Sequence, residues 1–205
     1  MTDRHDHWEK VYATKAATDV SWYQAHARRS LELIHAAAPD RSAPIIDIGG
    51  GASTLVDDLL ADGYVDLSVL DISEAALAQA KARLGAMRAG KVTWIAADIA
   101  AWTPQRQWAV WHDRAVFHFL VEKPEQDAYI AALTAATAPG ATAIFATFAL
   151  DGPNKCSGLA VQRYSPRVLA ERLGPSFRLM SEAAEHHHTP WGADQRFAWT
   201  VLERR

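Results

Sequence analysis

Residues 44–54, Pro-Ile-Ile-Asp-Ile-Gly-Gly-Gly-Ala-Ser-Thr, decide the fold class of this chain. A short Ile-rich run without polar alternation leads there into three consecutive glycines. Such a run is typical of a strand that is buried on both faces of a parallel sheet. The glycines predict a tight turn that brings the backbone close to a ligand, and Ser53 can cap a helix over 54–61.

The glycine turn lacks the full pattern of two common nucleotide-binding motifs. A dinucleotide fingerprint would need glycines at 49, 51 and 54, but position 54 is Thr. A phosphate-binding P-loop would need Gly-Lys followed by Ser or Thr, and this sequence is absent from the turn. A nicotinamide-dependent oxidoreductase is therefore a weaker alternative for this chain.

Outward from the turn, apolar runs alternate with amphipathic segments. We expect further strands at 67–70, 92–96, 108–111, 141–148, 177–185 and 196–203, and helices at 6–14, 24–37, 73–87, 125–137 and 166–173. This alternation predicts an α/β fold with a mostly parallel, doubly wound sheet covered by helices on both faces. The tight connection between the last two strands permits an antiparallel pair.

Acidic residues follow several of the expected strands at one edge of the sheet. They are Asp47, Asp71, Asp98 and the pair His112–Asp113. Ligands bind beyond the carboxyl ends of the strands in sheets of this kind. Acids at four strand ends in register indicate a ligand site rather than ordinary loop residues.

The order of these elements resembles the class I S-adenosylmethionine-dependent methyltransferases, over about residues 43–147. Asp47, Gly49 and Gly51 meet the acid-x-Gly-x-Gly pattern of the family's first motif, and Gly50 lies within it. The resemblance implies a Rossmann-like sheet of seven strands, mostly parallel, with an antiparallel last strand. It also implies S-adenosyl-L-methionine as the cofactor and methyl transfer as the activity.

The same resemblance implies cofactor contacts in the later loops. Asp71 matches the acid that binds both ribose hydroxyls, because a carboxylate accepts two hydrogen bonds from a diol. Asp98 matches the acid that receives the adenine amino group, and Ile99 matches the neighbour whose backbone amide meets the ring. Ile72 would lie against the adenine face. His112, at the end of the fourth strand, completes the predicted cofactor contacts.

The N-terminal segments 7–12 and 20–24 are rich in aromatic residues. They resemble a segment that folds over the cofactor in a subgroup that includes lysine methyltransferases. A lid that excludes water would then be formed by Trp8, Tyr12, Trp22 and Tyr23. The alternative is that these side chains only pin a helix onto the core.

The stretch 111–120, Trp-His-Asp-Arg-Ala-Val-Phe-His-Phe-Leu, borders the transferable methyl group in the family that it resembles. Asp113 and His118 are the candidate general bases, and His is the commoner base near neutral pH. Asp113 can alternatively position the methionine part of the cofactor, and His118 can be a satisfied histidine packed between phenylalanines. Arg114 can orient an anionic acceptor or pair with Asp113.

Cys156, His186 and His188 are predicted to border the acceptor. Cys156 follows the fifth strand, and the three histidines lie between the last two strands. In an extended segment His186 and His188 share one face, and His187 points to the other. A thiolate and two imidazoles can bind zinc or copper, but the spacing matches no standard zinc signature, so we expect no metal. The alternative is a solvated histidine turn and a buried, inert cysteine.

The length of the chain predicts one domain. The resemblance implies that this domain has three parts: a helical lid segment at 1–38, a cofactor core at 43–150 and an acceptor-side part at 151–205. The chain has 205 residues, of which 49% are hydrophobic, and a formal net charge of −3. This charge does not favour nucleic acid or anionic membranes as partners, and no apolar run has the length of a membrane span. One cysteine excludes an internal disulfide and fits a cytoplasmic location.

The acceptor is the least specified part of this interpretation. The stretch 111–120 lacks the Asn/Asp-Pro-Pro-Tyr motif of many nucleic-acid amino methyltransferases, which argues against a base substrate. A small-molecule acceptor is the leading hypothesis. A protein-lysine methyltransferase and a non-catalytic cofactor-binding protein are the alternatives.

Overall fold

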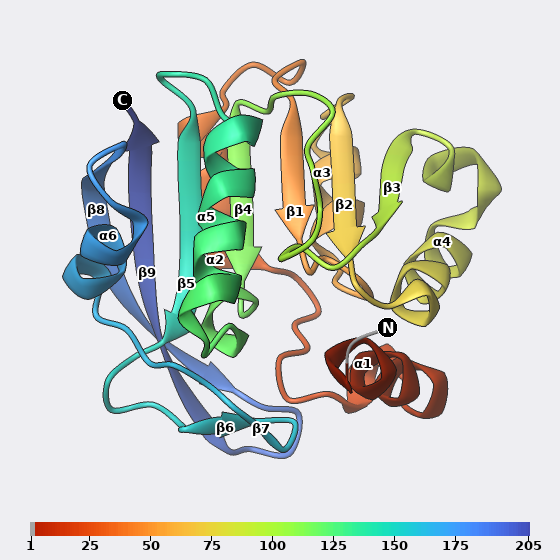
Figure 1. The fold of residues 1–205 in the computed structure, drawn as a ribbon. Coiled ribbons are helices and arrows are strands. Elements are labelled where there is room, and N and C mark those ends of the chain that lie inside the picture. The colour runs from red at the N-terminus through yellow and green to blue at the C-terminus, as the bar shows by residue number, and fades with distance from the viewer. Residues whose placement is uncertain (1–2) are drawn as a thin grey trace.

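The computed structural model describes residues 3–205 and contains a seven-stranded sheet between two layers of helices (Figure 1). The strands are β1 (Ile45–Ile48), β2 (Leu67–Asp71), β3 (Val92–Ala96), β4 (Val110–Arg114), β5 (Thr142–Phe148), β8 (Phe177–His188) and β9 (Asp194–Arg204). The helices are α1 (Asp3–Thr14), α2 (Arg28–Ala37), α3 (Leu55–Ala61), α4 (Glu74–Ala89), α5 (Lys123–Ala136) and α6 (Pro166–Leu173). Two 3-10 turns, η1 (Ala17–Asp19) and η2 (Phe117–Phe119), and a small hairpin of β6 (Lys155–Cys156) and β7 (Leu159–Ala160) complete the elements.

The strand order is β3-β2-β1-β4-β5-β9-β8. Strands β1 to β5 of the sheet are mutually parallel, whereas β9 runs antiparallel to both β5 and β8. The predicted doubly wound sheet with an antiparallel last strand is thus confirmed. The carboxyl ends of the parallel strands meet at one edge, and α1 and the β6–β7 hairpin lie beyond that edge (Figure 1).

The two faces of the sheet carry separate apolar cores. Ile45 packs on the face covered by α2, α3 and α4, whereas Ile46 and Ile48 pack on the face covered by α5 and α6. All three side chains are at most 1% exposed, so β1 is buried on both faces. The non-alternating Ile run reflects this two-sided burial.

Strand β4 begins and ends later than its predicted range of 108–111. Val110 is the first residue that pairs with both neighbours, β1 and β5, whereas the Trp108 N–H bonds the Ala136 carbonyl at the end of α5. His112 and Asp113 therefore lie inside the strand and not in the loop after it. Both side chains are buried, and the polar partners that make this burial possible are described below.

Strand β8 continues through the three histidines that we expected between the last two strands. Residues 186–188 pair with 194–196 of β9, and the hairpin closes through the Thr189 N–H and the Ala193 carbonyl. The histidines were not predicted to be part of a strand because they are polar. An edge strand such as β8 can carry polar residues because solvent lies beside it. The predicted helix 24–37 starts four residues late, at Arg28, and the β6–β7 hairpin was not expected.

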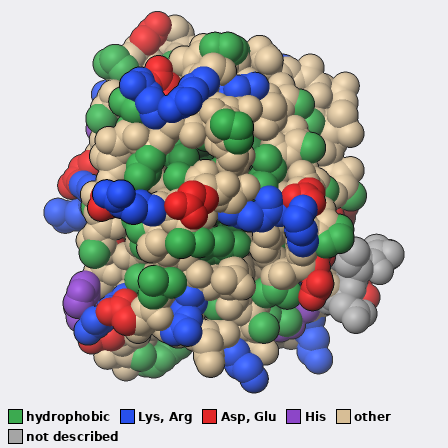
Figure 2. All heavy atoms as spheres, turned by 60° about the vertical axis from the view of Figure 1, so that its left-hand side comes forward, with side chains coloured by type: hydrophobic (Ala, Val, Ile, Leu, Met, Phe, Trp, Pro, Cys, Tyr) green, Lys and Arg blue, Asp and Glu red, His purple; other side chains and the backbone are tan. Residues whose placement is uncertain are grey.

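The surface over the β8 side of the molecule mixes charges of both signs (Figure 2). Ion pairs in this part of the chain include Arg172 with Asp127 and Arg178 with Glu203. This face has no single-sign field of the kind that gathers nucleic acid. Within residues 3–205, no helix is both long enough and apolar enough to cross a bilayer.

Candidate active site

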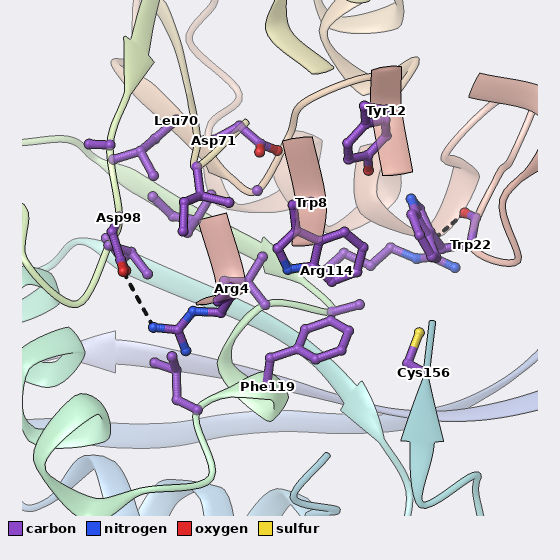
Figure 3. A pocket seen from close by; sticks show the side chains of 18 residues that line it. Arg4, Trp8, Tyr12, Trp22, Leu70, Asp71, Asp98, Arg114, Phe119 and Cys156 are labelled. Atoms are coloured by element: carbon purple, nitrogen blue, oxygen red, sulfur yellow. Dashed lines mark hydrogen bonds and ion pairs between the residues drawn. The ribbon is translucent and has the colours of Figure 1, made fainter. Parts of the chain in front are cut away.

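A cavity with about 700 Å³ of empty space, part of it open to solvent, lies at the carboxyl ends of β1, β2 and β4 (Figure 3). It unites many of the predicted site residues from distant parts of the chain. Those in its wall are Trp8, Tyr12, Trp22, Gly49, Asp71, Ile72, Asp98, Ile99, Arg114 and Cys156. The edge of the sheet that the acidic residues indicated is therefore hollow.

A second cavity, with about 550 Å³ of empty space, lies on the other side of the glycine turn. The predicted residues Asp47, Gly50 and His112 line this second cavity and not the first. Four residues line both cavities and mark the boundary between them: Tyr12, Trp22, Gly49 and Arg114.

The glycine turn is built so that side chains from neighbouring elements can approach it. Gly49 has φ +67° and Gly51 has φ +24°, and side chains rarely adopt these values. A Cβ atom at Gly49 would overlap with Val116, and one at Gly51 would overlap with the Asp71 carboxylate. Glycine is therefore required for conformation and for space at both positions.

The Asp71 carboxylate reaches the cavity from the end of β2. Its Oδ1 accepts a hydrogen bond from the Ser73 N–H at 2.8 Å, and the residue is 5% exposed. Burial raises the pKa of Asp71 to about 7, and the nearby Asp47 and Glu9 carboxylates add to this rise. A diol at this position would supply hydrogen bonds that favour the ionised form, so the carboxylate fits a ribose.

Asp98 lies at the opposite end of the cavity from Cys156 (Figure 3). Its Oδ1 accepts the Ala100 N–H at 3.0 Å, and its Oδ2 pairs with Nη2 of Arg4 at 3.4 Å. The same guanidinium also bonds Glu125 at 3.0 Å. Arg4 thus ties the start of α1 to the acid that we expected to receive the adenine amino group.

Helix α1 covers the cavity with aromatic side chains. The Trp8 ring lies 5.5 Å from Trp22 and 5.1 Å from Phe119 between ring centroids, and both contacts are edge-to-face. The Glu9 carboxylate fixes the helix from the other side, because it accepts hydrogen bonds from the Ser73 hydroxyl at 2.8 Å and the Ala75 N–H at 3.2 Å. These contacts form a roof and also pin the helix, so both predicted roles fit the geometry.

Sequence reasoning missed Arg4, Glu9 and Phe119. A signal for Arg4 was present, since Arg4, Trp8 and Tyr12 follow at intervals of four and share one face of a helix. No comparable local spacing identifies Glu9, whose partners lie more than sixty residues away.

His112 holds three elements together beside the second cavity. Its Nδ1 lies 2.7 Å from Oδ1 of Asp47 on β1, and its Nε2 lies 2.9 Å from the Ser30 hydroxyl on α2. Asp47 and His112 are direct partners in the register of β1 and β4. His112 therefore orients the first-motif acid, which is a more indirect role than the cofactor contact we expected.

Asp113 does not line either cavity. Its carboxylate accepts the Tyr129 hydroxyl at 2.5 Å and the backbone N–H groups of Val116 at 2.9 Å and Phe117 at 3.1 Å. Burial raises its pKa to about 6 against the lowering effect of these hydrogen bonds. This arrangement disagrees with the general-base prediction and makes Asp113 an anchor for the loop that follows β4.

His118 is likewise outside both cavities. It is fully buried, and its Nδ1 accepts the Phe148 N–H at 3.2 Å. Burial and the charge of Arg114 lower its pKa to about 3, so the ring is neutral at physiological pH. The alternative interpretation, a histidine packed among phenylalanines, describes this environment, with Phe119 and Phe148 rings 4.6 and 4.7 Å away.

Arg114 points its guanidinium across the cavity toward Trp22 (Figure 3). Nη1 donates to the Trp22 carbonyl at 3.1 Å, and the group lies 4.8 Å from the centroid of the Phe197 ring. Nε and Nη2 are buried and have no hydrogen-bond partner among residues 3–205. Burial lowers the pKa of Arg114, and no ion pair with Asp113 forms.

Of the predicted acceptor residues, the structure brings only Cys156 to the cavity. It is 5% exposed, and burial raises the pKa of its thiol to about 11, so it is not a thiolate at neutral pH. His186 and His188 are exposed on one face of β8, and His187 points inward and donates through Nε2 to the Ser21 carbonyl at 2.7 Å. No group of three metal-ligating side chains occurs in the described chain.

Comparison with known proteins agrees with this geometry. Residues 45–140 match a family model described as a methyltransferase domain. Residues 45–140 therefore carry a methyltransferase domain. The matched region holds the glycine turn, Asp71 and Asp98, and the cofactor of this methyltransferase is S-adenosyl-L-methionine.

Solved methyltransferases share the fold along nearly the whole chain. N-methyltransferase NodS from Bradyrhizobium japonicum, in complex with S-adenosyl-L-homocysteine, has a TM-score of 0.72 at 16% identity, over 96% of this chain and 97% of that protein. An S-adenosylmethionine-dependent methyltransferase from Anabaena variabilis reaches 0.73 at 16% identity, over 100% and 96%. The glycopeptide N-methyltransferase MtfA reaches 0.67 at 13% identity, over 91% and 93%.

One curated relative is similar in sequence over a shorter segment. The eEF1A lysine and N-terminal methyltransferase of Mus musculus is 32% identical over 83 residues. That segment is 40% of this methyltransferase chain and 12% of the mouse protein.

Proposed function

We propose that the chain transfers the methyl group of S-adenosyl-L-methionine to a nucleophilic atom of a small molecule. The observation that carries this proposal is the aromatic roof of Trp8, Trp22 and Phe119, which encloses the cavity at the end away from Asp98. The cavity is lined mostly by apolar and aromatic side chains with a few charged groups, which is the composition typical of small-molecule sites.

The proposed chemistry depends on alignment and on the exclusion of water. Methyl transfer is an in-line displacement at a sulfonium-bound carbon, and the bound cofactor supplies that carbon. Asp71 and Asp98 would hold the nucleoside, and the roof would keep water from the reacting atoms. Among the described residues that line this cavity, the carboxylates are Asp71 and Asp98, and the nucleoside would engage both of them. The acceptor would therefore react as a free nucleophile, with its proton already lost.

A protein-lysine acceptor is the second candidate. The observations that favour it are the similarity to the mouse lysine and N-terminal methyltransferase and the N-terminal segment that folds over the cavity. A lysine side chain would have to pass under the roof. A non-catalytic cofactor-binding protein is the third candidate, because the general bases expected from sequence do not reach the cavity.

Two measurements on the purified chain test the proposal. Isothermal titration with S-adenosyl-L-methionine, and with NADH as the control, should give binding of the first alone. Incubation with methyl-labelled cofactor and a cell extract, divided into low-mass and protein fractions, should place the label in the low-mass fraction. Label in the protein fraction would contradict the small-molecule proposal and support a protein acceptor. Cofactor binding without label in either fraction would support the non-catalytic candidate.

A further inference from the structure

Two of the three guanidinium nitrogens of Arg114 are buried and make no hydrogen bond within residues 3–205. Nη1 bonds the Trp22 carbonyl, whereas Nε and Nη2 are buried and have no hydrogen-bond partner within residues 3–205. A buried charged donor without a partner destabilises the folded state, and natural structures rarely retain one without a reason. The arrangement therefore indicates a ligand that completes these hydrogen bonds.

The two unused nitrogens define the shape of that ligand. Nε–H and the adjacent N–H of Nη2 lie on one edge of the planar guanidinium and point in parallel directions. Two parallel donors of this kind match the two oxygens of a carboxylate or a phosphate. A single hydroxyl would leave one donor unpaired, and an ammonium, which is a cation without an acceptor, would pair with neither.

The acids near Arg114 are already engaged elsewhere. Glu185 accepts Gln24 Nε2 at 3.2 Å through one oxygen and Trp199 Nε1 at 2.7 Å through the other. Asp47 pairs with His112 at 2.7 Å. Both carboxylates favour the charged form of Arg114 from a distance, and neither forms an ion pair with it.

The position of Arg114 points to the acceptor. Asp98 and Asp71 mark the proposed nucleoside end of the cavity, and the Arg114 guanidinium lies on the side of Trp22 and Cys156 (Figure 3). We propose that the Nε–Nη2 edge of Arg114 binds an oxyanion of the methyl acceptor, so that the substrates are acidic small molecules that carry a carboxylate or a phosphate. This inference rests on the proposed small-molecule methyltransferase function.

Titration of the protein loaded with S-adenosylhomocysteine tests this inference. The probes are benzoate, phenyl phosphate and benzamide, because benzamide has the shape of benzoate without its charge. We expect benzoate or phenyl phosphate to bind at least about 10-fold more tightly than benzamide, since hydrogen bonds to a charged group are the strong ones. The stronger of the two anions identifies the acceptor group as a carboxylate or a phosphate.

Variants assign the effect to the guanidinium. Arg114→Gln should weaken anion binding about 10- to 100-fold, and Arg114→Lys, which keeps the charge without the parallel donors, should fall between. Arg106→Gln is the matched control, because Arg106 pairs with Asp66 on the surface, and it should leave anion binding unchanged.

The cofactor's own carboxylate is the competing partner for Arg114. Titration with S-adenosylhomocysteine and with methylthioadenosine, which lacks that carboxylate, separates the two. If Arg114→Gln weakens only the first, the guanidinium binds the cofactor and the inference is overturned. The inference is also overturned if neither benzoate nor phenyl phosphate binds more tightly than benzamide, or if neither anion binds at millimolar concentrations. Failure of the wild-type chain to bind S-adenosylhomocysteine contradicts the proposed function itself.

Discussion

Replacing Asp71 with asparagine should make the free protein more stable while it weakens cofactor binding. Burial raises the pKa of this carboxyl from 3.8 to about 7, so the folded state holds its proton more tightly than the unfolded state. Ionisation of Asp71 therefore destabilises the fold. This penalty is absent below the unfolded pKa, grows as the pH rises from about 4 to about 7, and is complete above that.

The size of the effect follows from the shift. About three pKa units at about 1.4 kcal/mol each give a penalty of about 4 kcal/mol near pH 8, and of about 2 kcal/mol near pH 5. Asparagine keeps an oxygen that can accept the Ser73 N–H and carries no charge. Asp71→Asn should thus raise the free energy of unfolding, and by about 2 kcal/mol more near pH 8 than near pH 5.

Urea unfolding of the wild type and Asp71→Asn at the two pH values measures this difference. Glu182→Gln is the control, since Glu182 is exposed and a surface substitution should change stability by less than about 0.5 kcal/mol. Affinity for S-adenosyl-L-methionine should fall about 10- to 150-fold in Asp71→Asn. A variant that is no more stable near pH 8, or whose gain does not depend on pH, would refute the burial argument. Unchanged affinity would refute the ribose assignment.

Three further substitutions test the rest of the site. Gly49→Ala should abolish cofactor binding as measured by titration. Gly63→Ala is the control, because φ is also positive there but the space is open, and it should cost only about 1 kcal/mol of stability and leave cofactor binding intact. Equal loss of cofactor binding in the two variants would contradict the steric role of Gly49. Tyr129→Phe should lower the free energy of unfolding by about 1–3 kcal/mol through loss of its bond to Asp113, with the pH profile of turnover unchanged; an altered profile would restore Asp113 as a base. Trp8→Ala should reduce turnover more than it reduces cofactor affinity. Full turnover in this variant would contradict the proposed role of the aromatic roof in excluding water.

The cofactor end of the site was predictable because its chemistry is encoded locally. The strand, the glycine turn and Asp47 are contiguous in the chain, and Asp71 and Asp98 each follow an apolar run that the structure confirms as β2 or β3. Parallel strands place such residues at one edge of the sheet whatever the distant sequence is. Spacing and residue type were therefore sufficient there.

The acceptor end was less predictable because its side chains are defined by distant partners. Asp113 accepts a hydrogen bond from Tyr129 on α5. His118 bonds the backbone of Phe148 on β5, thirty residues away, through Nδ1 alone, and its Nε2 has no partner within residues 3–205. No local pattern distinguishes such an anchor from a free base. The sequence suggested Arg114 as an anion-binding residue, but the unused edge of its guanidinium is visible only in the structure.

The histidines of β8 illustrate a different limit. Alternation correctly placed His186 and His188 on one face and His187 on the other, but it could not say which face was solvent. Register with β9 decides this, and it directs His187 toward Ser21 of the N-terminal segment. The residue that the sequence did not select is thus the one that contacts the lid segment.

The β6–β7 hairpin, which we propose borders the acceptor, is separate from the seven-stranded sheet. Cys156 reaches the cavity from this two-stranded hairpin, which pairs with no strand of the seven-stranded sheet. Residues 155–160 can therefore be exchanged without changing the register of any strand that carries a predicted cofactor contact. For enzyme engineering, this hairpin is the segment to randomise in order to change the acceptor preference while the proposed cofactor site stays the same.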